Sequence, residues 1–250
     1  MSYLNEDLSN LYISSLLKPQ PSMGAKVEIN LTKTLAWQNK YANQIKKHVG
    51  FELSITPLYL YAIAKCMTEM PESNCRIEGS KIITHDSVDI GILSTLGEYG
   101  QDGGMIIIRN ASEKNVEDLL SDINNTHKSL NKTFNYEKKL PPELLQRLQK
   151  ISKIMNQPTV IVNTLSLYGV EIDHPYLPEG IGVVLTFGTI RNSLKERNGN
   201  ILSSKVTNLY GVYNPLMASG VNAMRFMGRL RQIIENAEYQ TSVAVNSEVL

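Results

Sequence analysis

The sequence predicts one α+β domain, a mostly mixed β-sheet with helices packed on it, and three observations support this prediction. Stretches that alternate apolar and polar residues are separated by stretches with helical periodicity, and the chain becomes β-rich from Pro158 onward. No internal repeat of about 20 to 50 residues is visible. No Pro-, Gly- or Ser-rich linker separates the two halves, so we expect all elements to share one core.

The composition argues against several classes of protein. Of the 250 residues, 42% are hydrophobic and 20% are charged, which is typical neither of disorder nor of a membrane protein. The net charge of +1 gives no electrostatic reason for binding nucleic acid or an anionic membrane surface. The first residues are polar and acidic, unlike a secretory signal. Cys66 and Cys75 lack metal-ligand spacing, so we expect a cytoplasmic protein with reduced thiols and no metal site.

The first third of the chain is expected to hold one strand and two helices. Residues 26–32 alternate as a strand does, and residues 34–48 have the pattern of an amphipathic helix with a basic last turn. Residues 54–70 form the second helix, with Pro57 suited to its first turn and Pro71 as its stop. Apolar residues surround its axis, so we expect this helix to be buried centrally.

A pair of strands is expected next, Lys81–Thr84 and 88–94, joined across residues 85–87. The glycine-rich stretch 97–104 lacks the Gly-Lys-Ser/Thr sequence of a phosphate loop, and a strand rather than a helix follows it at 105–109. The flexible connection of a hairpin is therefore the simpler interpretation.

Two polar helices should precede the β-rich part of the chain. Ser112 can cap a helix over 113–130, and a pair of prolines begins another over 141–155. Strands are then expected at 158–169, 180–188 and 201–214.

A strand-to-helix junction lies near the end of the chain, in the stretch LYGVYNPLMASGVNAMRFMGRL. Enzymes display catalytic side chains at such junctions, yet the turn 214–220 contains no residue that titrates near neutral pH. The helix after the turn is expected to place one apolar face on the core, formed by Met224, Met227, Leu230 and Ile234.

Six segments, taken in order, carry a resemblance to a known family: KVEINLTKTLAWQNKY, LSITPLYLYAIAKCMTEMPESNC, KIITHDSVDIGIL, IIIRNASEKNVEDLLSDI, PTVIVNTLSLYG and GVNAMRFMGRL. They resemble landmarks of the catalytic core of the dihydrolipoamide acyltransferases of 2-oxoacid dehydrogenase complexes. That superfamily also contains chloramphenicol acetyltransferase. Each segment is weakly specific alone, but six in the right order are hard to obtain by chance.

The resemblance implies a fold, an assembly and a division of the chain. The fold would be the two-layer α+β sandwich of CoA-dependent acyltransferases, chloramphenicol acetyltransferase-like, with a mixed sheet and helices. The assembly would be a homotrimer with clefts at the subunit interfaces. The core would span residues 15–236, between an N-terminal extension, 1–14, and a C-terminal tail, 237–250.

The family's chemistry depends on a His-x-x-x-Asp-Gly motif, and this chain departs from it. Here Asn214 is followed by Pro215 at the position of the general base, and Ser219 stands at the acidic position before Gly220. Asn163 falls where the family has its Ser oxyanion donor, and an Asn amide can serve that role. Proline cannot abstract a proton. The resemblance therefore implies a core that lacks a step worth on the order of 10²–10⁴ in rate.

His174, next to Asp173, is the candidate for a relocated base, because the segment EIDHPYLPEG resembles a family segment near the pocket and the trimer axis. The alternative is a solvent-facing or capped loop histidine.

The tyrosines Tyr168, Tyr210 and Tyr213 lie near the two motif positions in the sequence, and a phenol can donate a hydrogen bond to a carbonyl. Packing in the core with a satisfied hydroxyl is the alternative for them. Arg109 matches the family's Arg in an Arg-Asp-Ala junction, where we expect it to hold the fold together. The resemblance places a ligand cleft at Asn163, Tyr168, Tyr213, Pro215 and His174.

Three functions remain open. The cleft can be repurposed, either to bind a ligand or to catalyse a reaction without the family's base. The chain can instead be a non-catalytic structural subunit that co-assembles with an active acyltransferase core. It can also be a CoA-dependent acyltransferase that uses His174 as its base. CoA or an acyl thioester is a possible ligand by resemblance, whereas the family's usual acyl transfer to CoA or lipoamide is disfavoured.

Overall fold

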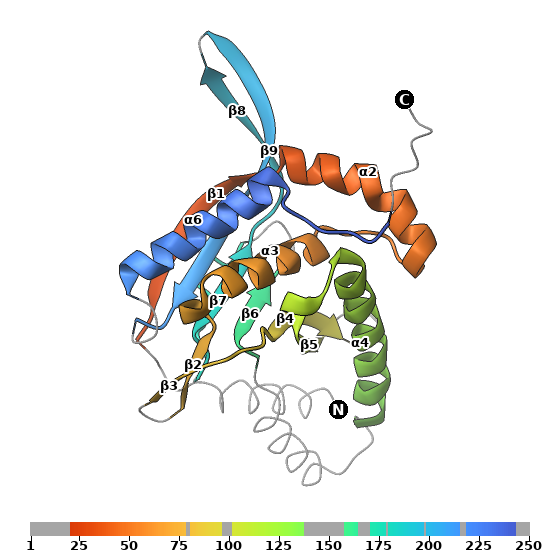
Figure 1. Ribbon diagram of the computed structural model, residues 1–250, viewed down its shortest axis with the longest axis vertical. Coiled ribbons are helices and arrows are strands. Elements are labelled where there is room, and N and C mark those ends of the chain that lie inside the picture. Colours follow the sequence, from red (N-terminus) through yellow and green to blue (C-terminus); the bar gives the residue numbers. More distant parts are fainter. Residues whose placement is uncertain are drawn as a thin grey trace, which may run out of the picture.

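The protein is described by a computed structural model in which one mixed sheet carries helices on one face (Figure 1). The helices are α2 (Thr32–Val49), α3 (Thr56–Glu69), α4 (Val116–Glu137) and α6 (Gly220–Asn236), with short 3₁₀ turns η1 (Pro71–Ser73) and η2 (Ala111–Glu113). The residues that the structure describes are 21–78, 81–96, 102–137, 158–164, 171–178, 180–197, 199–215 and 219–243. The helix expected over 141–155 lies outside them, as does Tyr168.

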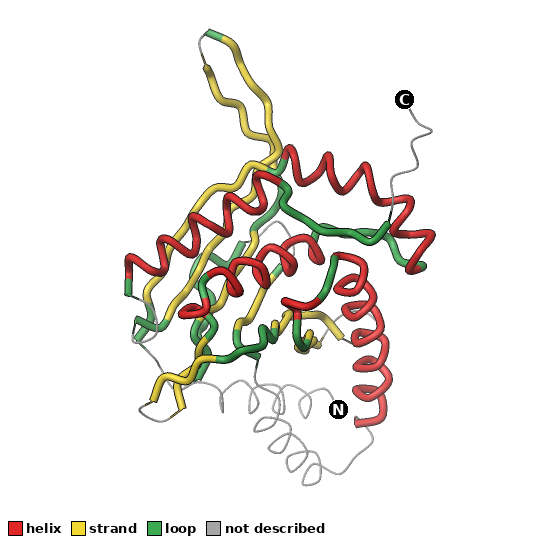
Figure 2. Tube along the Cα trace, in the orientation of Figure 1, coloured by secondary structure: helices red, strands yellow, loops and turns green. Residues whose placement is uncertain are grey.

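The sheet has seven strands. Six of them lie in the order β1-β9-β7-β6-β4-β5, and the seventh, β8, pairs with the first half of β9, residues 200–206. Strand β6 runs parallel to both β4 and β7, whereas the other pairs are antiparallel. The β8–β9 ribbon projects from the body of the domain (Figure 2). The strands are β1 (Met23–Asn30), β4 (Ile90–Leu96), β5 (Asp102–Ile108), β6 (Val160–Asn163), β7 (Val183–Phe187), β8 (Arg191–Arg197) and β9 (Asn200–Tyr213); β2 (Cys75–Glu78) and β3 (Lys81–Thr84) form a separate hairpin.

Helix α3 lies at the centre of the helical layer, as its sequence predicted. Ten of its 14 residues are buried, and Tyr59 stacks on Phe187 of β7 with ring centroids 3.8 Å apart. Because side chains alternate along a strand, the same face of the sheet also presents Val162, Leu185 and Leu209 to the helices. This is the main hydrophobic core.

The opposite face of the sheet, here called the far face, has a second and smaller apolar cluster. Ile161, Val184 and Val212 lie in one row across β6, β7 and β9. Leu177 and Ile181 pack on them. The segment around residues 171–181 therefore covers part of the far face.

The hairpin predicted between Lys81–Thr84 and 88–94 is wrong. Strand β3 pairs with β2, and β4 pairs with β5 and β6 inside the main sheet. The reason is burial: Ile90 and Ile92 of β4 are almost fully buried, whereas Ile82 of β3 is 54% exposed. An apolar strand gains more by entering the sheet than by pairing with its exposed neighbour in sequence.

Two details of the helices also differ from the prediction. Ser112 lies in η2 and does not cap α4; instead Asn115 Oδ1 accepts from the Asp118 N–H at 2.9 Å, and Asp118 Oδ2 accepts from the Asn115 N–H at 3.2 Å. In α6, Met224 is 64% exposed, while Met227, Leu230 and Ile234 are buried as expected. Ala223 and Phe226 take the place that Met224 was expected to fill.

Residues 237–243 follow α6 and lie across the helical layer; we call them the strap. Glu238 is held by Arg229, with Nη2 to Oε2 at 2.9 Å, and by Lys65, whose Nζ is 2.9 Å from the same oxygen. Arg229 also forms a bidentate pair with Glu69 of α3, with distances of 2.6 and 2.9 Å. The hydrogen bonds from Arg229 and then Lys65 lower the pKa of Glu238 from 4.5 to about 2.

Acid should therefore weaken the attachment of the strap. A carboxylate whose pKa is lowered on folding contributes stability that is complete above its unfolded pKa and is lost as the pH falls through its folded value. The free energy of unfolding should fall between pH 4.5 and about 2. Urea titrations across this range would measure it. Arg229→Met should make this part of the pH profile flatter, and an unchanged profile would contradict the assignment.

Candidate functional site

The turn that carries the family motif joins the last residue of β9 to α6. Asn214 is buried, and its N–H donates to the Gly182 carbonyl at 3.0 Å. Pro215 is exposed. Ser219 is the N-cap of α6, because its Oγ accepts from the Asn222 N–H at 3.3 Å. The serine at the acidic position of the motif thus has a structural use as the N-cap. Residues 216–218 lie outside the described part of the chain.

Asn163 lies at the other end of the sheet from this turn. Its register partner on β7 is Thr186, and the partner of Thr186 on β9 is Tyr210. Pro215 is five residues further along the chain from Tyr210, and β9 is two strands away from β6. Strand spacing and rise therefore put Asn163 and Pro215 roughly 15–20 Å apart. One copy of the chain does not bring the two motif positions together.

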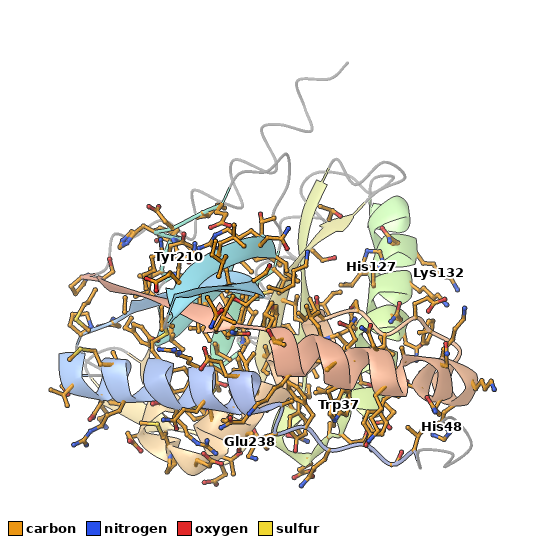
Figure 3. The ribbon with its side chains drawn as sticks, turned by 90° about the horizontal axis from the view of Figure 1, so that it is seen from above. Trp37, His48, His127, Lys132, Tyr210 and Glu238 are labelled. Atoms are coloured by element: carbon orange, nitrogen blue, oxygen red, sulfur yellow. The ribbon has the colours of Figure 1, made fainter. Side chains whose placement is uncertain are left out.

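Asn163 instead belongs to a polar row that crosses the far face. We define the polar row as Asn163, Thr186, Tyr210 and Lys26, which are successive partners across β6, β7, β9 and β1. Figure 3 shows Tyr210 on the side of the sheet away from Trp37 and Glu238, which lie with the helices. Lys26 is exposed, and its ammonium group lies 5.1 Å from the centroid of the Tyr210 ring.

The three inner residues of the polar row are buried, Asn163 to 2%, Thr186 to 1% and Tyr210 to 7% exposure. Within the described residues, the Thr186 hydroxyl has no hydrogen-bond partner. A buried polar group without a partner costs about 1–3 kcal/mol, so the Thr186 hydroxyl is a candidate contact for a ligand group.

Glu171 organises the end of the polar row next to β9. Its Oε2 accepts from the Tyr210 hydroxyl at 3.0 Å and from Asn208 Nδ2 at 3.4 Å, while Oε1 accepts from the Thr189 N–H at 2.8 Å. Burial alone would raise the pKa of Glu171. These three hydrogen bonds and the charge of Arg191 outweigh burial and lower that pKa from its ordinary value. Glu171 is therefore an anion at neutral pH.

His174 lies on the far face close to the turn, not close to Asn163. Its ring packs on Gly24, where an added Cβ would lie 3.2 Å from Nδ1, and Gly24 pairs with Val212 of β9. The His174 ring is exposed, and Nε2 lies 3.5 Å from Ser22 Oγ. In the described part of the chain, no carboxylate, including that of Asp173, pairs with the His174 ring.

Tyr213 points to the helical layer and not to the far face. Its ring makes an edge contact with Phe226, with centroids 6.4 Å apart, and burial raises the pKa of its phenol. Gly211 leaves room for the Tyr213 side chain, because a Cβ at Gly211 would lie 2.6 Å from the phenol oxygen. The structure therefore places Tyr213 in the main core, on the opposite face of the sheet from Asn163 and His174.

A hollow of about 390 Å³ lies on the helical side between α3, η2 and α4. Its two lysines are already paired, Lys65 with Glu238 and Lys114 with Asp122. It is distant from the polar row and gives no reason to place chemistry there.

Sequence reasoning named Asn163 and Tyr210 but missed Glu171, Thr186 and Asn208. Glu171 lies in the segment EIDHPYLPEG, three residues before His174. The segment was interpreted through its histidine alone. Arg109, which was expected to hold the fold together, donates from Nη1 to Asp89 Oδ2 at 2.6 Å. No group of three or more potential metal ligands occurs among the described residues, and no helix there is long and apolar enough to cross a membrane.

Comparisons with known proteins agree with this fold. The family model described as 2-oxoacid dehydrogenases acyltransferase (catalytic domain) matches residues 13–241. The lipoamide acyltransferase component of the branched-chain alpha-keto acid dehydrogenase complex of Bacillus subtilis (strain 168) is 24% identical over 228 residues, which cover 89% of this chain and 49% of the relative. The chain thus spans about half the length of the curated relatives that it matches.

Two solved structures share the fold. A probable dihydrolipoamide acetyltransferase of Listeria monocytogenes 4b F2365 superposes with a TM-score of 0.74 at 18% identity, covering 98% of this chain and 94% of that chain. The dihydrolipoamide acetyltransferase of Azotobacter vinelandii gives a TM-score of 0.75 at 18% identity, covering 94% and 89%. The two-layer α+β fold and the resemblance read from the six sequence segments are confirmed.

Proposed function

Because the chain belongs to the 2-oxoacid dehydrogenases acyltransferase (catalytic domain) family, we propose that it is an acyltransferase-fold core with a repurposed cleft. The cleft binds its ligand at the polar row, without the family's general base. The observation that carries this proposal is the buried Thr186 hydroxyl, which has no partner in the described residues and stands between Asn163 and Tyr210. Pro215 at the position of the base supports the absence of the family's usual acyl transfer.

The chemistry of the polar row favours a ligand with a carbonyl oxygen. The Thr186 hydroxyl and the Asn163 amide are hydrogen-bond donors on neighbouring strands, about 4.8 Å apart in the sheet. Two such donors suit one carbonyl oxygen. CoA thioesters are the first class to test, because the named relatives are acyltransferases.

The proposal predicts opposite effects of one substitution on stability and on binding. Thr186→Val keeps the shape of the side chain and removes the unpaired hydroxyl, so the free protein should become no less stable. The affinity for acetyl-CoA should fall about fivefold, the equivalent of roughly 1 kcal/mol for one hydrogen bond. Thermal shifts with CoA and acetyl-CoA measure both effects, since a ligand at 100 times its Kd stabilises by about 2.7 kcal/mol.

Ser193→Ala is a matched control, because Ser193 lies on the projecting β8–β9 ribbon and not in the polar row. Binding should be unchanged in this variant. If neither CoA nor acetyl-CoA raises the unfolding temperature of the wild type, the CoA thioester is rejected as the ligand class.

A relocated base is the second candidate, and the position of His174 favours it. The ring lies beside the first residues of β1, whose partners lead directly into the motif turn. An acyltransferase with this base would lose its activity in His174→Ala, whereas the repurposed cleft would keep its ligand affinity in the same variant.

We further propose that the chain forms a homotrimer, since one copy keeps Asn163 and Pro215 at opposite ends of its sheet. Mass photometry distinguishes the possibilities. A trimer of this chain alone supports the proposal, whereas a larger shell formed only with an active relative would support a structural subunit.

A further inference from the structure

We infer that Tyr210 and Glu171 form a proton relay at the polar row. Tyr210 accepts a proton from a bound nucleophile and passes its own phenolic proton to Glu171. The inference rests on the proposed function, because the ligand must bind at the polar row for the relay to act. Tyr210 is the catalytic residue in this arrangement, and Glu171 acts through it.

The hydrogen bonds around the phenol set how a nucleophile can approach it. The Tyr210 hydroxyl donates to Glu171 Oε2 at 3.0 Å, so its proton is directed away from the ligand. A phenol donates one hydrogen bond and accepts through its oxygen. Asn208 Nδ2 donates to this oxygen at 3.2 Å and also lies 3.4 Å from Glu171 Oε2, so an O–H or S–H of the ligand can take its place on the phenol.

The carboxylate is fixed for its role by the surrounding backbone. The Thr189 N–H holds Oε1, and Gly188 lies so close that a Cβ there would be 2.6 Å from the carboxyl group. Asn208, which touches both Glu171 and Tyr210, accepts from Arg191 Nη2 at 3.4 Å through its own Oδ1. Each partner of the pair is therefore oriented by a further contact.

Two cations lie near the pair. Lys26 lies over the Tyr210 ring, and Arg191 lies on the side of Asn208. The charge of Arg191 lowers the pKa of Glu171 and so keeps this carboxylate ionised. Arg191 also pairs with Glu28 at 2.9 Å, so part of its charge is already compensated.

The step balances as an acyl transfer from a thioester to a hydroxyl or thiol. The oxygen or sulfur of the nucleophile bonds to the carbonyl carbon while its proton moves to Tyr210 Oη, and the phenolic proton moves to Glu171 Oε2. The carbonyl electron pair becomes an oxyanion held by Thr186 and Asn163. When the C–S bond breaks, the proton returns from Glu171 through Tyr210 to the leaving thiolate. No oxidant or metal is needed.

Two conservative substitutions test the relay. Tyr210→Phe keeps the ring under Lys26 and removes the hydroxyl. Glu171→Gln keeps the size of the side chain and removes the proton acceptor. With acetyl-CoA as donor, and dithiothreitol or glycerol as the thiol or hydroxyl acceptor, each should lower kcat on the order of 10²-fold or more. The Kd for acetyl-CoA should stay within a few-fold in both.

The pH profile gives a readout that a merely structural role would not change. Glu171 must be ionised to accept the proton, and its pKa is lowered, so the wild-type rate should stay flat through the neutral range. It should decline only below the ordinary range of a carboxyl group. Glu171→Gln should lose this acidic limb. The carbon-13 signal of labelled Tyr210 Cζ should also respond to this substitution.

The outcomes separate the two proposals. If acetyl-CoA does not bind the wild type, the CoA thioester is not the ligand and the relay falls with it. If acetyl-CoA binds but neither acceptor is acylated, or if Tyr210→Phe keeps the wild-type rate, the relay is wrong and the binding site stands. Unfolding temperatures of both variants show whether a lost rate reflects lost folding.

Discussion

Tyr239→Ala is expected to lower the free energy of unfolding by about 3–5 kcal/mol, the range found for aromatic side chains removed from a core. Tyr239 is only 9% exposed although it lies in the strap, outside the regular elements. Its ring makes edge contacts with Trp37 of α2 at 5.3 Å and with Tyr61 of α3 at 6.0 Å between centroids. Its hydroxyl lies 3.0 Å from Thr34 Oγ1. One side chain therefore ties the strap to two helices.

Urea unfolding of the two variants Tyr239→Ala and Tyr239→Phe measures this contribution. Phenylalanine keeps the ring and loses only the contact with Thr34, whose hydroxyl still donates to the Ile234 carbonyl. This variant should therefore lose about 1 kcal/mol or less. If Tyr239→Ala lowered the free energy of unfolding no more than Tyr239→Phe, the ring would contribute nothing and the strap would not be part of the core.

The same strap is held from α4 by Glu117, which local patterns do not predict. Glu117 Oε1 accepts from the Ser242 N–H at 3.0 Å and from the Val243 N–H at 3.3 Å, and also from the Thr241 hydroxyl. The sequence shows an acidic residue in the first turn of a helix, which the helix dipole explains without any partner. Only the folded chain shows that the carboxylate has a second use, because its partners are more than a hundred residues away.

The fold was predictable where the signal is local. Helix α3 has apolar residues around its whole axis, and Pro57 and Pro71 mark its ends, so its place in the centre followed from the sequence. The prediction of the partner of β3 was wrong because strand pairing depends on competition between strands that are distant in the sequence. The sequence shows that β3 and β4 are strands, but burial of Ile90 in a parallel pair with β6 decides their partners.

The candidate site shows the same difference between what is local in the sequence and what depends on the fold. The proline at residue 215, where the resemblance places the general base, is visible in the sequence, since the motif is contiguous. The polar row is not, because Asn163, Thr186 and Tyr210 become neighbours only through the registers of β6, β7 and β9. A shift of one residue in any of these registers would turn the side chains to the helical layer. Sequence alone therefore located the departure from the motif but not the residues of the polar row.

Gly188→Ala should disrupt the site through Glu171, at an expected loss of about 2 kcal/mol in the free energy of unfolding. A Cβ at residue 188 would lie 2.6 Å from the Glu171 carboxyl group. The backbone there cannot easily retreat, since the Gly188 N–H donates to the Asn208 carbonyl at 2.8 Å and its carbonyl accepts from Thr207 Oγ1 at 2.8 Å. Glu171 must therefore move and release Tyr210.

A double-mutant cycle with Glu171→Ala identifies where the loss arises. Once the carboxylate is absent, the three atoms nearest to a Cβ at residue 188 are gone, so Gly188→Ala should then lose less than about 0.5 kcal/mol further. Denaturant titrations of the four proteins give the coupling energy. An equal loss from Gly188→Ala in both backgrounds would mean that the backbone of residue 188, and not Glu171, carries the strain. Tyr210 would then keep its carboxylate partner in the single variant, and the relay proposed above would be unaffected.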